Sequence, residues 1–172
     1  MAEGELQLDS ESKFKARAGE IARRWMNAGL APLLIGLQGD LGSGKTTWVR
    51  GMLEGLGHAG RVPSPTYTLV ETYALEKITL VHVDLYRLST SDDTDSQAEI
   101  ESLGLRDWLE QSATWLLVEW PDRSPLLASR CDLRVAFEAG AGEQRTLRFS
   151  ALSRLGETAL KELALYSKSA SS

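Results

Sequence analysis

The chain has 172 residues, of which 42% are hydrophobic and 25% charged, ordinary values for one globular domain. Its formal net charge of −5 argues against tight nucleic-acid binding by the chain itself, because such binding needs a basic surface. No apolar run approaches the ~20 residues of a membrane span, and the acidic start does not resemble a signal peptide. The single cysteine, Cys131, fits a reducing compartment, so we expect a cytoplasmic protein.

The first predicted elements are a helix and a buried strand. Apolar residues at helical spacing predict the helix from Ser12 to Asn27, and Gly29 and Pro32 end it. The following segment, Leu33 to Gln38, is almost wholly apolar. Such a run is expected of a central parallel strand that is covered on both faces.

The segment after that strand matches in full the pattern G-x-x-x-x-G-K-[ST] of nucleoside triphosphatases, through Gly39, Asp40, Leu41, Gly42, Ser43, Gly44, Lys45 and Thr46. Its glycines let successive backbone N–H groups point at phosphate oxygens, and the helix predicted from Thr46 to Leu56 adds the positive end of its dipole. Lys45 can reach the β- and γ-phosphates, and the Thr46 hydroxyl can ligate Mg²⁺. We therefore expect this loop, with the adjacent Thr47, to bind a nucleoside triphosphate.

A stiff, extended connection is predicted from Pro63 to Thr66, because proline restricts both its own backbone and the residue before it. The hydroxyls of Ser64 and Thr66 lie just after the first helix of the nucleotide core. In the chain, this is the position of a γ-phosphate sensor.

The rest of the chain reads as two hairpins, a further buried strand and two helical regions. The predicted strands are Tyr67–Leu75, Ile78–Val83, Trp115–Val118, Leu133–Phe137 and Thr146–Phe149. The segment Glu99–Gln111 is predicted to be at least partly helical, and a last helix begins at Ser153. We expect the polar, acidic segment Ser89–Ser96 to be a solvated loop rather than a metal site, and residues 167–172 to be a disordered Ser-rich tail.

Two of the predicted strands end in a carboxylate. Asp84 follows the strand Ile78–Val83, and Glu119 follows Trp115–Val118. Mg²⁺ at a triphosphate needs such an acid, usually from the end of a buried strand next to the phosphate-binding loop. We expect at least one of the two acids to be functional. His82 and His58 are interpreted as structural, because a lone histidine is more often a satisfied structural side chain than a ligand. Trp120 is a core residue, an adenine neighbour or a partner contact, and the usual burial of tryptophan favours the core.

Four segments together resemble the TsaE (YjeE) family of small bacterial ATPases, which act in the threonylcarbamoyladenosine modification of tRNA: GDLGSGKTT, SPTYTLVE, HVDLYRL and LVEWPDR. The match runs from about Gly39 to Arg123. The resemblance implies an α/β fold with a three-layer, P-loop NTPase-like core. The mixed sheet of this core would carry antiparallel hairpin additions, and residues 1–166 would form a single ATPase domain. It implies ATP as substrate, Mg²⁺ as cofactor and the TsaB and TsaD proteins as partners. In the pathway of that family, TsaD transfers the threonylcarbamoyl group to adenosine 37 of tRNA. We therefore expect this chain to contact tRNA only indirectly, through the complex, and to bind no membrane.

The resemblance also implies roles for particular residues. Lys45 would hold phosphates, and Thr46 and Glu119 would lie at Mg²⁺. Asp84 would be the second acid, near the metal, the γ-phosphate or the attacking water, and Thr66 would belong to a switch-like loop. The catalytic candidates are thus Lys45, Thr66, Asp84 and Glu119, and further residues expected near the nucleotide are Glu11, Ser12 and Arg145. The stretch from Arg87 to Leu103 is longer and more acidic than the usual connection in the family.

Other functions of a phosphate-binding loop remain open at this point. A small-molecule kinase is the main alternative, although the acidic segment Ser89–Gln97 lacks the arginines of a phosphate-binding lid. A GTPase would need an N-K-x-D-type segment, and none occurs. A nucleotide-sensing subunit with very slow turnover is a fourth possibility.

Overall fold

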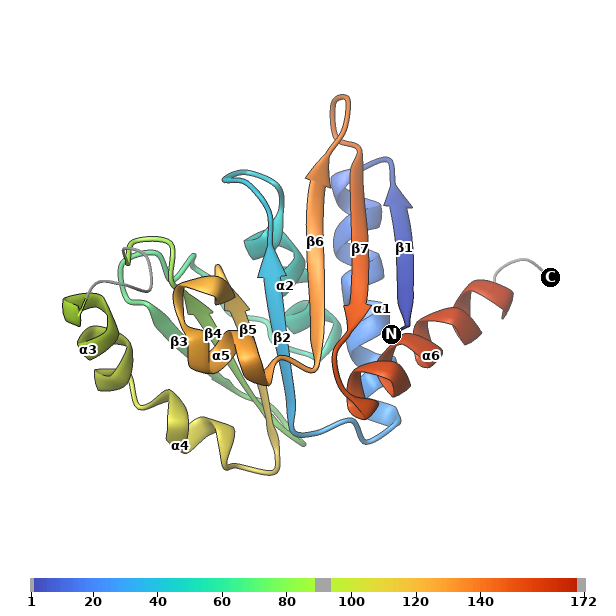
Figure 1. The fold of residues 1–172 in the computed structure, drawn as a ribbon. Coiled ribbons are helices and arrows are strands. Elements are labelled where there is room, and N and C mark those ends of the chain that lie inside the picture. The colour runs from blue at the N-terminus through green and yellow to red at the C-terminus, as the bar shows by residue number, and fades with distance from the viewer. Residues whose placement is uncertain (1, 89–93, 170–172) are drawn as a thin grey trace.

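The structure, a computed structural model, describes residues 2–88 and 94–169, with side chains described up to residue 163. In this part of the chain, one mixed sheet has the strand order β1-β7-β6-β2-β5-β4-β3 (Figure 1). The strands are β1 (Glu3–Leu8), β2 (Leu33–Gln38), β3 (Val70–Ala74), β4 (Thr79–Asp84), β5 (Thr114–Glu119), β6 (Leu133–Ala139) and β7 (Arg145–Ala151). The helices are α1 (Glu11–Asn27), α2 (Lys45–Gly55), α3 (Thr94–Ser102), α4 (Leu105–Leu109), α5 (Pro125–Arg130) and α6 (Arg154–Ser169), with a 3₁₀ turn η1 (Pro121–Arg123).

The centre of the sheet is parallel and its flanks are antiparallel. β2 pairs in parallel with β5 and β6, and β5 pairs in parallel with β4. β3, β7 and β1 add antiparallel strands at the two sides. The α/β fold with antiparallel additions that the sequence predicts is confirmed, and the carboxyl ends of β2, β4 and β5 lie at one edge of the sheet, where ligands bind in such folds.

Helices cover both faces of the sheet, which gives the predicted three layers (Figure 1). One hydrophobic cluster lies between the sheet and α1, α2 and α6, and a second lies between the sheet and α3, α4 and α5. Along β2, Leu33, Ile35 and Leu37 enter the first cluster and Leu34 enters the second. β2 is therefore buried on both faces, as its apolar sequence predicts.

Glycines let α1 and α2 approach each other closely. A Cβ atom on Gly55 would lie 2.3 Å from the Cα atom of Gly19, and one on Gly51 would lie 2.5 Å from the carbonyl oxygen of Lys15. Only hydrogen atoms fit at these positions. The contact fixes α2, and with it the loop at its N-terminus, against the first helix.

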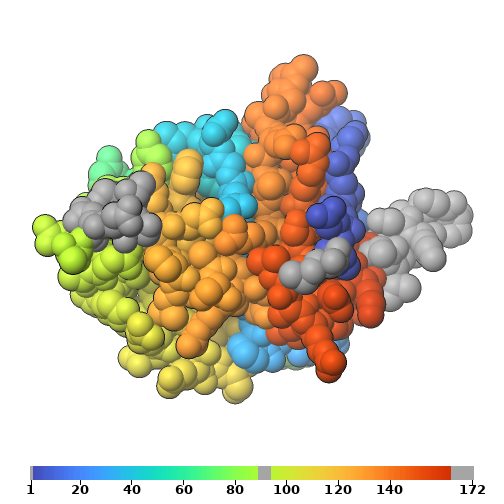
Figure 2. Space-filling view, viewed as in Figure 1, coloured from blue at the N-terminus to red at the C-terminus, as the bar shows by residue number. Residues whose placement is uncertain are grey.

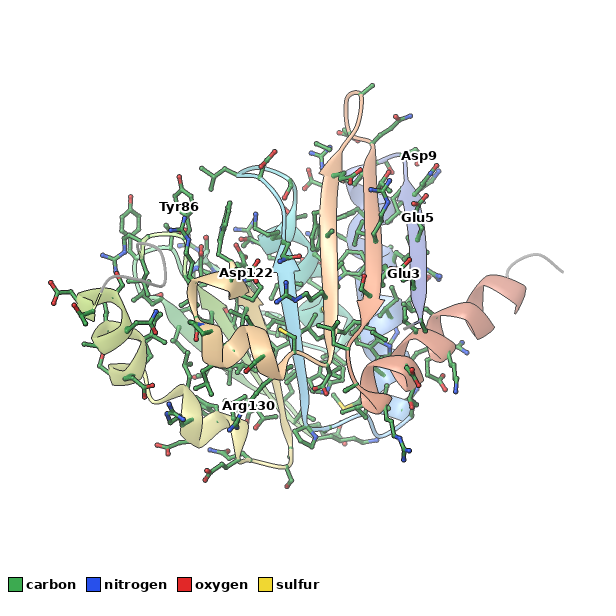
Figure 3. All side chains as sticks on the ribbon, in the orientation of Figure 1. Glu3, Glu5, Asp9, Tyr86, Asp122 and Arg130 are labelled. Carbon is green, nitrogen blue, oxygen red and sulfur yellow. The ribbon has the colours of Figure 1, made fainter. Side chains whose placement is uncertain are left out.

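β1 and α5 are not among the elements predicted from the sequence. In β1, exposed and half-buried residues alternate, and Glu3 and Glu5 lie along the outer edge of the sheet (Figure 3). A short edge strand of this kind has no apolar run to reveal it, and its pairing with β7 makes it a strand. α5 has six residues, too few for a helical period to be recognised.

Three predicted boundaries are also corrected. A turn closed by the hydrogen bond from Leu69 N–H to Pro65 O precedes β3, so this strand starts at Val70 rather than Tyr67. α3 begins at Thr94, within the segment predicted to be a loop, because the side chain of its residue Ile100 is buried in the second cluster. Residues 89–93 lie outside the described part. α6 continues to Ser169, into the tail predicted to be disordered, because no glycine or proline follows Gly156 to end the helix. Residues 170–172 again lie outside the described part.

Candidate functional site

A cavity of about 400 Å³ lies at the sheet edge where β2, β4 and β5 end. It is lined by the loop between β2 and α2 and by Glu143 and Arg145 of the β6–β7 hairpin. The tip of this hairpin projects beyond the sheet at the same end (Figures 1 and 2). The lining residues are Glu11, Phe14, Leu41, Gly42, Gly44, Lys45, Thr46, Thr47, Ser64, Thr66, Asp84, Glu119, Glu143 and Arg145.

The loop between β2 and α2 is shaped for an anion. Gly44, the residue before α2, has φ 108°, a conformation that side chains rarely allow, and no side chain caps the helix. The first N–H groups of α2 therefore remain free to bind a ligand. At the other end of the loop, a Cβ atom on Gly39 would lie 2.7 Å from the Phe137 carbonyl oxygen, so the close approach of β6 requires glycine there.

Lys45 is the buried cation of the site, with 5% of its surface exposed. Its Nζ atom donates hydrogen bonds to the carbonyl oxygens of Gly39 (2.6 Å) and Asp40 (3.0 Å). Burial lowers the pKa of Lys45 below its usual value, and the negative charges of Glu119 and Asp84 oppose this shift. A phosphate group placed in the loop would supply the negative charge that this buried ammonium group needs.

The two carboxylates that end β4 and β5 lie beside the loop, and both are buried. The Thr46 hydroxyl donates to Glu119 Oε1 at 2.8 Å. Asp84 accepts from the Thr66 hydroxyl at 3.1 Å and from the Tyr86 N–H group at 2.9 Å. Burial raises the pKa of Asp84 above its usual value; the Tyr86 hydrogen bond opposes this shift, and the charge of Glu119 adds to it.

Arg87 ties the loop that carries Thr66 to the end of β4. Its guanidinium group donates to the carbonyl oxygens of Thr66 (3.2 Å) and Tyr67 (3.1 Å). Within the loop, the hydroxyl oxygens of Ser64 and Thr66 are 2.8 Å apart. The loop is thus held at the cavity by two side chains at the end of β4, Asp84 and Arg87.

The structure brings together nearly all of the residues that the sequence predicts for the site. Gly39, Asp40 and Ser43 complete the loop, and the other predicted residues line the cavity, with the exception of Ser12. Ser12 lies in an adjoining groove between α1 and α2. Ser64 lines the cavity beside Thr66, in the loop that the sequence places at the position of a γ-phosphate sensor. Phe14 and Glu143 line the cavity without having been predicted as ligand-binding residues. No sequence motif marks Phe14 or Glu143, because only the fold brings α1 and the β6–β7 turn to the loop.

His82 and Trp120, interpreted from sequence as structural, both touch site residues. His82 Nε2 is 2.9 Å from Glu119 Oε1. Trp120 is only partly buried, with a backbone φ of 60°, and its ring lies 4.9 Å from Lys45 Nζ and 5.2 Å from the ring of Tyr86. Trp120 packs against the second hydrophobic cluster, and the left-handed turn after Glu119 also brings its ring to the site beside Lys45.

The described residues contain no group of three or more His, Cys, Asp and Glu side chains arranged to hold a metal. None of their helices combines the length and the apolar character needed to cross a membrane.

Comparison with known proteins gives a consistent result. Residues 8–147 match the family described as Threonylcarbamoyl adenosine biosynthesis protein TsaE. A protein of Haemophilus influenzae named tRNA threonylcarbamoyladenosine biosynthesis protein TsaE is 38% identical over 125 residues, which cover 73% of this chain and 74% of the relative. Proteins of the same name from Bacillus subtilis (32% identical, covering 76% of this chain and 77% of the relative) and Streptomyces coelicolor (36% identical, 80% and 90%) are also similar.

A solved structure agrees with the fold. The crystal structure of Bacillus subtilis YdiB superposes with a TM-score of 0.70 at 23% identity, covering 96% of this chain and 97% of that one. At this identity the likeness concerns the fold, which is that of a P-loop NTPase-like α/β protein. Because the family match extends over most of the sequence and several relatives exceed 30% identity, the chain belongs to the TsaE family.

Proposed function

We propose that this protein binds ATP together with Mg²⁺ and hydrolyses it. The observation that carries the proposal is the convergence of Lys45, Glu119 and Asp84 on one cavity that the phosphate-binding loop also lines. A buried ammonium group, two buried acids and free helix N–H groups are the elements from which phosphoryl-transfer sites are built.

The residues of the cavity fit a magnesium ion. Thr46 and Glu119 would hold it, with Asp84 close by, and all three offer oxygen atoms, the ligands that Mg²⁺ prefers. Mg²⁺ at a triphosphate usually takes one or two carboxylates and completes its shell with phosphate oxygens and water, and Glu119 and Asp84 would supply the carboxylates. When bound, the ion would neutralise charge on the phosphates.

The chain's own groups would do the remaining work. The loop N–H groups and Lys45 would hold the phosphates and stabilise the charge that develops on them. Asp84 Oδ2 would orient the attacking water and accept its proton, and its raised pKa suits a base better than that of an exposed aspartate. Thr66, hydrogen-bonded to Asp84, would report the γ-phosphate to the Pro63–Thr66 loop.

The proposed biological role follows from the family. The relatives are named as proteins of tRNA threonylcarbamoyladenosine biosynthesis, which supports a place in that pathway. We infer that ATP hydrolysis serves the TsaB–TsaD pair, and that the protein works in the cytoplasm. With a net charge of −5, the chain is a poor principal binder of tRNA, so its partners would make most of that contact.

The test is a measurement of phosphate release by the full chain alone, with TsaB and TsaD, and with candidate small phosphoryl acceptors. We expect slow release by the isolated chain and faster release with the pair, because charge stabilisation is sometimes completed by a partner. Lys45→Ala is the control for contaminating ATPase activity. Stimulation by a small molecule alone, with a phosphorylated product, would identify a kinase and contradict the proposal.

A further inference from the structure

His82 is a buried polar residue directly beneath the proposed metal site. It lies on β4, two residues before Asp84, with none of its side chain exposed. Residues two apart on a strand share a face, and Leu80 of the same strand packs in the cluster beneath α1 and α2. His82 therefore points to the same side of the sheet as Asp84 and the phosphate-binding loop.

Among the described residues, the side chain of His82 is hydrogen-bonded only to Glu119. Its Nε2 atom is 2.9 Å from Glu119 Oε1, whereas its Nδ1 atom is buried and has no hydrogen-bond partner within the described residues. A carboxylate only accepts hydrogen bonds, so Nε2 carries the proton and donates. The same oxygen, Oε1, also accepts from the Thr46 hydroxyl at 2.8 Å.

These two donors fix the carboxylate of Glu119. One comes from the helix that follows the phosphate-binding loop, and the other comes from the neighbouring strand, so rotation of the carboxylate would break at least one hydrogen bond. Both act on Oε1, which leaves Oε2 without a hydrogen bond from the described residues. The second oxygen is thus available to a ligand in the cavity that Glu119 lines.

Packing alone gives no reason for histidine at this position. A phenylalanine would fill a similar volume among the buried side chains of β4 and β5 without leaving a buried nitrogen unpaired. The unpaired Nδ1 is a cost that the hydrogen bond to Glu119 has to offset. The position is therefore best explained by what Nε2 does.

We propose that His82 is a positioning residue, which holds Glu119 in the orientation that binds Mg²⁺ with the nucleotide. The inference rests on the proposed function and deepens it, because it assigns to the site a residue behind the metal ligand. Loss of the Nε2 donor should weaken the Mg²⁺-dependent part of nucleotide binding and leave the Mg²⁺-independent part unchanged. Removal of a hydrogen bond that orients a metal ligand typically reduces metal affinity about 10- to 100-fold.

The experiment measures the affinity of the full chain for a non-hydrolysable ATP analogue by calorimetry, with Mg²⁺ and with EDTA. His82→Phe removes the donor and keeps a ring, and His82→Gln keeps an N–H group at a similar distance from the backbone. Val81→Ala is the matched control, because Val81 is a buried neighbour on the opposite face of the same strand. Thermal unfolding of each variant shows how much each change weakens the fold.

We expect His82→Phe to reduce the gain in affinity due to Mg²⁺ about 10- to 100-fold, and His82→Gln to restore much of it. Val81→Ala should lower the melting temperature and keep the full Mg²⁺ effect. In the Glu119→Gln background, His82→Phe should have no further effect on Mg²⁺ dependence, because both changes act through one carboxylate.

Two results would overturn the inference in distinguishable ways. If His82→Phe and His82→Gln both melt at lower temperature and keep the wild-type Mg²⁺ effect, while Lys45→Ala has lost nucleotide binding, His82 is only a packing residue and the proposed ATP site stands. If the wild-type chain itself binds the analogue equally well with Mg²⁺ and with EDTA, the proposed function fails and this inference fails with it.

Discussion

Asp84 and Glu119 are directly paired in the parallel register of β4 and β5, as the last residues of both strands. The pairing places two buried carboxylates next to each other at the edge where the phosphate-binding loop begins. Two like charges in such a position favour a cation between or near them. Burial is the main cause of the raised pKa of Asp84, and the charge of Glu119 adds to it. The register makes the pair suitable for the proposed metal-dependent reaction on phosphate.

We expect Glu119→Gln and Asp84→Asn to impair hydrolysis more than binding. Each change keeps the shape of the side chain and removes its charge, so phosphate release with TsaB and TsaD present should fall about 100-fold or more. Affinity for the ATP analogue without Mg²⁺ should stay within about tenfold of wild type, since the loop and Lys45 hold the phosphates. Wild-type turnover in both variants would show that the two acids are not catalytic.

Asp84 should also make the nucleotide-free fold less stable at neutral pH. Because the pKa of Asp84 is raised in the folded protein, the protonated side chain stabilises the fold relative to the charged one. This stabilisation is fully present below the ordinary aspartate pKa of about 3.9 and is lost as the pH rises through the raised value. Asp84→Asn should therefore raise the melting temperature at pH 7, and the gain should shrink as the pH falls towards about 4. Glu76→Gln, at an exposed position, is the control, and an equal melting temperature for Asp84→Asn and wild type at pH 7 would contradict the prediction.

Lys45→Ala should remove most of the nucleotide affinity without unfolding the protein. A hydrogen bond to a charged group contributes about 1.5–3 kcal/mol, so the loss of the ammonium group should weaken binding of the ATP analogue about 10- to 150-fold. Circular dichroism should be unchanged, because the side chain contacts the carbonyl oxygens of Gly39 and Asp40 rather than the hydrophobic clusters. Calorimetry that gives the wild-type affinity would refute the assignment of the loop.

Gly55→Ala should be among the most destabilising single changes in α2. Its Cβ atom would lie 2.3 Å from Gly19 Cα, so the two helices would have to separate, at a cost of about 1–3 kcal/mol or more. Glu54→Ala is the matched control, since Glu54 is exposed and its ion pair with Lys15 is worth at most about 1 kcal/mol. Urea unfolding of both variants tests the difference, and equal stabilities would mean that α1 and α2 separate without cost.

The separation of α1 and α2 should also act on the site. α2 carries Lys45 and Thr46 at its first turn, and its position depends on the glycine contact with α1. A weakened affinity for the ATP analogue in Gly55→Ala, measured under conditions where the variant is folded, would connect the helix packing to the loop.

Local sequence patterns predict the loop after β2, the strand β2 itself, both hairpins and the first helix. The phosphate-binding loop is contiguous in sequence, so its eight residues predict both a conformation and a chemistry. β2 is placed from Leu33 to Gln38 and both hairpins are recognised, because an apolar run and short-range alternation do not depend on distant partners. The helix predicted from Ser12 begins one residue earlier, at Glu11, after Ser10, whose hydroxyl accepts a hydrogen bond from the Lys13 N–H group.

Only the tertiary structure decided which distant residues meet. His82 and Glu119 are 37 positions apart, and their hydrogen bond exists because β4 and β5 pair in one particular register. β1 becomes a strand only by pairing with β7, and Glu143 enters the cavity only because the β6–β7 hairpin reaches the phosphate-binding loop. Contacts of this kind depend on strand register and on packing between segments far apart in the chain, and these do not follow from the local preferences of the residues involved.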